Sequence, residues 1–127
     1  MSLEVDGPTL DRLERLVALL VDRTSKGAAQ WRIRKTPLDS EPVFSLSTPN
    51  FTVHLRRSDR IGAPEIRIVD EEGNEVLDYL AGGIVTSADP RYMRINHDVD
   101  DLFAIVRKMT MRTARKLDRL IGDIEKL

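Results

Sequence analysis

Basic side chains that could bind an anion occur at alternating positions in the middle third of the chain. Arg32 and Arg34 are two residues apart, as are His54 and Arg56. Side chains two apart share a face of a β-strand, so we expect an arginine-rich outer sheet face with one histidine. A guanidinium group binds carboxylate or phosphate through two parallel hydrogen bonds, which suits an anionic peptide or a phosphoester. The ordinary alternative is a hydrated face, and this one lacks the aromatic side chains that stack RNA bases.

A second basic set lies near the C-terminal end of the sequence. Lys108, Arg112, Arg115 and Arg119 follow one another at spacings of three or four residues, within about 60° on one side of a helix. Binding to a phosphate backbone requires such a row, whereas the ordinary alternative is a solvated helix face. The net charge of the chain is −1, so nucleic acid is a possible partner but not the favoured one.

Sequence motifs for catalysis and metal binding are missing. The chain has no cysteine, which excludes a Cys-ligated zinc or iron–sulfur site. It has neither a Gly-x-Ser-x-Gly elbow nor a glycine-rich phosphate loop that ends in Lys-Ser/Thr. The run His97-Asp98-Val99-Asp100-Asp101 lacks the spacing of a calcium loop, and helix capping by Asp98 explains it better. We therefore predict no cofactor, no metal and no enzymatic activity. A small enzyme would have to use His54, in a pocket between sheet and helix.

The elements that position these side chains begin with an amphipathic helix over Leu10–Asp22. Apolar residues recur there every three or four positions, on one face. Thr9 is the expected N-cap, and Gly27 is the residue expected to take the left-handed conformation that ends the helix.

The hydrophobic period then changes from 3.6 to 2, which predicts an antiparallel meander of four or five strands. The strand segments are Trp31–Arg34, Val43–Thr48, Phe51–Arg56, Glu65–Asp70 and Glu75–Leu80. Thr48-Pro49-Asn50 and the Gly73 region are typical of hairpin connections. One face of the sheet should be buried and the other hydrated. Ala81–Asn96 is predicted as a loop, with Ile84 and Val85 turned inward.

A second amphipathic helix is predicted from Asp98 to the end of the sequence. It rises roughly 40 Å, whereas a six-residue strand spans only about 20 Å. The sheet can therefore shield only part of its apolar stripe, and these residues lie beyond it: Leu117, Leu120, Ile121, Ile124 and Leu127. Each such side chain left in water forfeits about 1.5–3 kcal/mol. Three arrangements could shield them: the N-terminal helix, a second copy of the chain, or a bend near Met111–Thr113.

The length of 127 residues predicts one domain, over 1–127. Its class is α+β: an N-terminal helix, an antiparallel β-meander of four to five strands, and a long C-terminal helix packed on one sheet face. No apolar run approaches the roughly 20 residues of a membrane span, and no leader is recognised, so we expect a cytoplasmic protein without a membrane partner. The pattern resembles that of small bacterial α+β proteins. We predict a protein-interaction module, a homodimer formed through Leu117, Leu120, Ile121 and Ile124. Nucleic-acid or anion binding through the two basic sets is the alternative.

Overall fold

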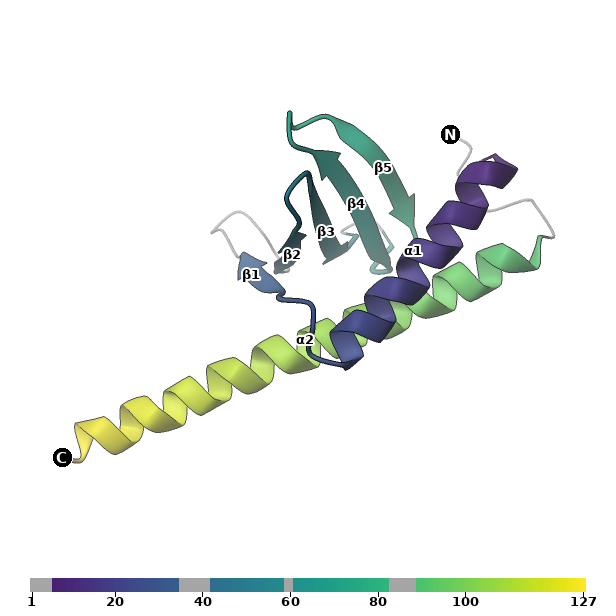
Figure 1. Ribbon diagram of the computed structural model, residues 1–127. Coiled ribbons are helices and arrows are strands. Elements are labelled where there is room, and N and C mark those ends of the chain that lie inside the picture. Colours follow the sequence, from purple (N-terminus) through teal and green to yellow (C-terminus); the bar gives the residue numbers. More distant parts are fainter. Residues whose placement is uncertain (1–5, 35–41, 59–60, 83–88) are drawn as a thin grey trace.

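A computed structural model describes residues 6–34, 42–58, 61–82 and 89–127. The elements run in the order of Figure 1: α1 (Gly7–Ser25), β1 (Arg32–Arg34), β2 (Val43–Ser47), β3 (Phe51–Arg57), β4 (Pro64–Asp70), β5 (Glu75–Leu80) and α2 (Pro90–Glu125). The predicted α+β class is confirmed, because two helices accompany a five-stranded antiparallel sheet and α2 contacts β4.

Helix α1 forms where its apolar residues repeat with helical spacing, and it buries Leu10, Leu13, Val17 and Leu20. The predicted N-cap was wrong by three residues. The Asp6 carboxylate accepts from the Thr9 backbone N–H at 2.9 Å, and the Thr9 hydroxyl donates to the same carboxylate. Gly27 has φ +76° after the helix, as the sequence predicted.

The sheet is a meander in which every strand pairs with its neighbour in the sequence, in the order β1-β2-β3-β4-β5. Phe44 pairs with Leu55 and Leu55 with Ile66, and these apolar residues lie on the face that the helices occupy. Ser45 pairs with His54 and His54 with Arg67, on the opposite face. The alternation predicted from the sequence therefore separates a buried face from a hydrated one.

Helix α2 begins at Pro90, inside the stretch predicted as a loop, so the predicted N-cap Asp98 was wrong. Asp89 is the N-cap and accepts from the Arg91 backbone N–H at 2.9 Å. Proline suits the first helical turn because its φ is already helical and its missing N–H would have no partner there. The predicted inward position of Ile84 and Val85 lies outside the described residues.

The core fills the space between the sheet and the two helices. Phe44 of β2 meets Phe103 of α2 edge to face, with ring centroids 5.8 Å apart. Arg91 at the start of α2 donates to Asp11 and to the Gly7 carbonyl oxygen of α1. These contacts bring the N-terminal ends of both helices together, so that α1 lies against the first half of α2 (Figure 1).

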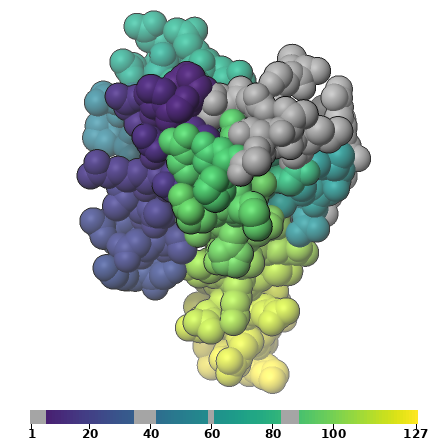
Figure 2. Space-filling view, turned by 90° about the vertical axis from the view of Figure 1, so that its right-hand side faces the viewer, coloured from purple at the N-terminus to yellow at the C-terminus, as the bar shows by residue number. Residues whose placement is uncertain are grey.

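Among the residues that the structure describes, no other element lies beside the second half of α2. Every residue from Met111 to Leu127 is exposed except Gly122, which is intermediate. The segment from Met111 to Glu125 rises roughly 22 Å at about 1.5 Å per residue, and its lower end projects from the molecule in Figure 2. Because α2 is one unbroken helix, the bend considered near Met111–Thr113 does not occur. The N-terminal helix does not reach this half either.

Candidate interaction surfaces on α2 and on the outer sheet face

The first candidate surface is the distal stripe, which we define as Leu117, Leu120, Ile121, Ile124 and Leu127. The first four side chains are 53–57% exposed, although each is a large aliphatic group. A helix alone already shields its backbone and the base of each side chain, so a side chain on an isolated helix is about half exposed. The exposed fractions of these four side chains are therefore those expected when no other element packs on them. Exposed apolar patches of this kind are typical of interaction sites, which makes the distal stripe a candidate surface.

The distal stripe continues the helix face that is buried in the core. Phe103 and Val106 lie on that face and are 4% and 0% exposed. Thr110 and Thr113 follow at spacings of four and three residues, and Leu117, Leu120, Ile124 and Leu127 extend the same alternation. Spacings of three and four in alternation define the a and d positions of a coiled-coil seam. The face therefore changes at about Thr110 from one that packs on the sheet to one suited to a second helix.

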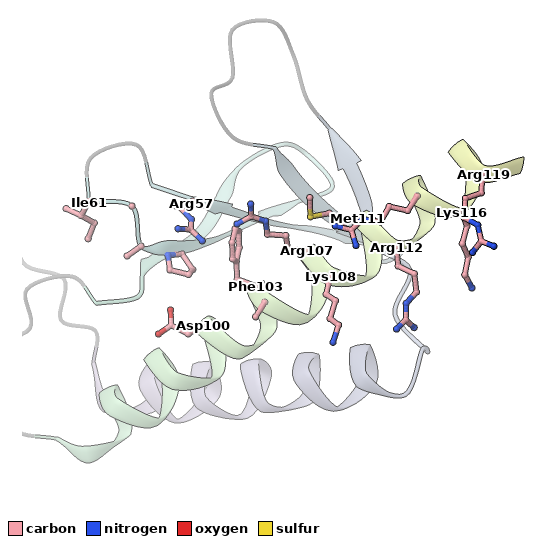
Figure 3. Close-up of a pocket in the computed structure, with 15 residues that line it drawn as sticks. Arg57, Ile61, Asp100, Phe103, Arg107, Lys108, Met111, Arg112, Lys116 and Arg119 are labelled. Carbon is pink, nitrogen blue, oxygen red and sulfur yellow. The ribbon is translucent and has the colours of Figure 1, made fainter. Parts of the chain in front are cut away.

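The second candidate surface, the basic groove, is a cleft of about 980 Å³ between the β3–β4 connection and the middle of α2 (Figure 3). Seven of its lining residues are cationic: Arg57, Arg107, Lys108, Arg112, Arg115, Lys116 and Arg119. The acidic residue in the lining is Asp100. All four members of the C-terminal basic set named from the sequence are therefore in one cleft.

The cations of the basic groove make no ion pair with any part of the chain that the structure describes. Lys108, Arg112 and Lys116 follow one another at intervals of four residues, where like charges repel across one helical turn. Arg57 comes from β3, and its guanidinium carbon lies 5.1 Å from the centre of the Phe103 ring. This arrangement keeps a strongly positive cleft over an apolar floor.

The third candidate surface is the outer sheet face, where a cleft of about 600 Å³ contains Arg34, His54 and Arg56. Three carboxylates line it as well, from Glu65, Glu75 and Asp78. Arg67 donates to Glu75 at 3.0 Å, and Arg56 lies 3.8 Å from Glu65. Arg32 is in register with Ser45 and thus on this face, but it does not line the cleft.

The charges of the outer sheet face act mainly on one another. Burial, together with Arg67 and Arg34, lowers the pKa of His54, so its imidazole is neutral at pH 7. Burial also raises the pKa of Glu65 and of Asp78. The negative charge of Asp78 adds to the effect at Glu65, and that of Glu75 adds to the effect at Asp78. Because cations and anions alternate there, this face has a weaker attraction for anions than the basic groove. His54 lies on the outer sheet face, as the alternation predicted, so it does not line a pocket between sheet and helix, which the enzyme alternative would require.

Sequence reasoning missed three cations of the basic groove, namely Arg57, Arg107 and Lys116. Arg107 and Lys116 flank the predicted row on the same helix, so a wider arc would have included them. Arg57 could not be found in this way, because only the pairing of β3 with β4 brings it to the helix.

The described residues contain no group of three or more potential metal ligands close enough to hold an ion. Among the same residues, no helix is both long and apolar enough to cross a membrane. Comparison of the chain with family models, with curated proteins and with solved structures finds no match.

Proposed function

We propose that this protein is an interaction module that self-associates through the distal stripe, with a second copy of the chain as its partner. The observation that carries the proposal is the half-exposure of four large aliphatic side chains on the second half of α2, beside which no other described element lies. A second copy supplies an identical stripe, so the same residues on both chains can shield one another in an isologous pair.

The gain from shielding the distal stripe is large enough to drive association. Burying an exposed Leu or Ile side chain contributes about 1.5–3 kcal/mol, so ten such side chains in a pair contribute roughly 15–30 kcal/mol at most. Association costs about 4–15 kcal/mol in lost motional freedom. The free energy gained by burial exceeds the free-energy cost of association over most of these ranges. We therefore expect a dissociation constant in the micromolar range or below.

The helix itself supports a paired state. Isolated helices shorter than about 12–15 residues are marginal in water, and the segment after Thr110 is of that length. Gly122 lowers its helix propensity by about 1 kcal/mol relative to alanine. Without a partner, this part of α2 depends only on propagation from the helix turns that are packed on the sheet.

Helicity measured against concentration tests the proposal. We expect the ellipticity at 222 nm per residue to rise with protein concentration from nanomolar to several hundred micromolar, following the same binding curve as the sedimentation coefficient. A helicity and a sedimentation coefficient that both stay constant over this range would refute self-association.

A second function is favoured by a separate observation, the seven cations of the basic groove, none of which forms an ion pair with a described residue. We propose that the groove binds a phosphate-rich polyanion, with nucleic acid as the candidate ligand. No aromatic side chain is exposed in the cleft, because its Phe103 is 4% exposed, so contact is to phosphates and not to stacked bases. Lys108, Arg112, Arg115 and Arg119 lie on the helix side opposite the distal stripe, so these four cations of the groove stay accessible when the stripe is paired.

Duplex DNA of mixed sequence, titrated at several salt concentrations, tests this second function. We expect binding at low salt whose logarithm falls linearly with the logarithm of salt concentration. The double variant Arg112→Glu with Arg115→Glu should lose at least tenfold in affinity. Arg12→Glu with Arg15→Glu is the matched control, since both residues are exposed on α1 with the same spacing. Equal loss in both variants, or no salt-dependent binding by the parent, would exclude a specific polyanion groove.

A further inference from the structure

We propose that the two copies pair antiparallel, with a two-fold axis that crosses the helix pair midway between Leu117 and Leu120. This inference rests on the proposed self-association and adds the orientation and register of the partner. Three observations on α2 carry it: the spacing of the stripe, the position of its charges and the place where the packed half of the helix ends.

The apolar spacing sets the layers of the pair. In an antiparallel coiled coil, each a position faces a d position of the partner. With the axis between Leu117 and Leu120, Leu117 faces the partner's Leu120, and Thr113 faces the partner's Ile124. Thr110 then faces the partner's Leu127. Each of these layers joins an a position of one copy to a d position of the other, and no position of the stripe is left without a facing residue.

The flanking residues fit the same register. Lys116 and Asp123 both lie on one edge of the stripe, and neither forms an ion pair within the described chain. Antiparallel pairing brings this edge against the same edge of the partner, so Lys116 faces the partner's Asp123, twice by symmetry. On the other edge, Ala114 faces the partner's Ile121, so that a small side chain leaves room for a large one. Parallel pairing would instead place Lys116 beside Ile121 and bring the two basic rows to the same level.

The position of the sheet excludes the parallel arrangement on steric grounds. The face that carries the distal stripe is occupied before Thr110 by the protein's own core, where Val99, Phe103 and Val106 are buried. In a parallel pair, the first half of the partner's α2 would run into this core. In the antiparallel pair, the helices overlap only over 110–127, and the rest of each copy lies beyond the other's helix end. This part of α2 projects past the sheet in Figure 1.

Engineered cysteines test the register, because the chain has none of its own. In the antiparallel pair, position 113 lies next to the partner's position 124, whereas the two copies of position 113 are roughly 16 Å apart along the axis. A disulfide needs Cα atoms within about 7 Å. Under mild oxidation we therefore expect crosslinked dimer from an equimolar mixture of Thr113→Cys and Ile124→Cys. Each variant alone is the matched control and should stay uncrosslinked.

Charge exchange gives an independent readout that needs no new covalent bond. Lys116→Asp should weaken dimerisation about tenfold, and adding Asp123→Lys to it should restore the parental dissociation constant. If the parent sediments as a dimer, two results would overturn the proposed register. One is crosslinking of Thr113→Cys alone, and the other is a charge exchange that fails to restore dimerisation. A parent protein that sediments as a monomer would overturn the proposed self-association itself.

Discussion

Replacement of Leu120 and Ile124 by aspartate separates association from folding more cleanly than any other change in this molecule. The two side chains are 53% and 57% exposed, so no packing in the protomer is lost. Aspartate lowers helix propensity by only about 0.5 kcal/mol per residue relative to leucine. The packed core is not changed by these substitutions. In the pair, four buried aliphatic side chains disappear, with a loss of roughly 6–12 kcal/mol before the cost of burying carboxylates.

A loss of that size weakens the dissociation constant by about four powers of ten or more. Sedimentation velocity at roughly 10–200 µM should show the double variant as a monomer and the parent as a dimer. Val76→Asp with Met93→Asp is the control, since both residues are exposed to a similar or greater extent, at 56% and 77%, but lie outside the distal stripe. A dimer that persists in the stripe variant, or a control that dissociates equally, would refute the assignment of the interface.

Four further outcomes test the contacts around α2 and the electrostatics of the outer sheet face. Tyr79→Phe removes the 2.6 Å hydrogen bond from the phenol to Asn96 and should cost about 1 kcal/mol in the free energy of unfolding, measured with urea. Burial raises the pKa of Tyr79 to about 12, so its contribution to stability is complete below pH 10 and is lost as the pH rises toward 12. The phenolate absorbance at 295 nm should therefore appear at a higher pH than for a free tyrosine. Absorbance that appears at the pH of free tyrosine would contradict the burial of Tyr79. Hydrogen bonds from Arg91 lower the pKa of Asp89 to about 2, so Asp89→Ala should lower the melting temperature at pH 7 but much less at pH 2, as calorimetry at both pH values can show. The pKa of His54, followed by NMR, should lie below 6.5 and should rise in Arg34→Gln; a value unchanged by that substitution would contradict the electrostatic coupling.

The fold followed from the sequence wherever the hydrophobic period was regular. The alternation of Phe51, Val53 and Leu55 gave β3 and its buried face, and Gly73 with φ +83° marks the predicted second hairpin. The start of α2 was not predicted because its first buried residues, Tyr92 and Ile95, are surrounded by polar residues and show no clear helical period. The aspartates at 98–101 imitate an N-terminal helix signal, yet they lie on the exposed side of a helix that has already begun.

The candidate surfaces could be predicted only where they lie on one helix. Periodicity alone identified the distal stripe and the basic row, since both follow from 3.6 residues per turn. Arg57 reaches the basic groove through strand pairing, and Glu75 and Asp78 reach the outer sheet face in the same way. Contacts of this kind between distant segments depend on the register of the sheet, which alternation in a single strand does not fix.

Sedimentation equilibrium of the unmodified protein decides whether the chain self-associates, because it measures molar mass without reference to shape. A protomer has a mass of 14.4 kDa, and we expect the weight-average mass to approach twice that value at high micromolar concentration and to fall on dilution. A mass that stays at 14.4 kDa up to millimolar concentration would contradict the account, since the distal stripe would then have no second copy to shield it.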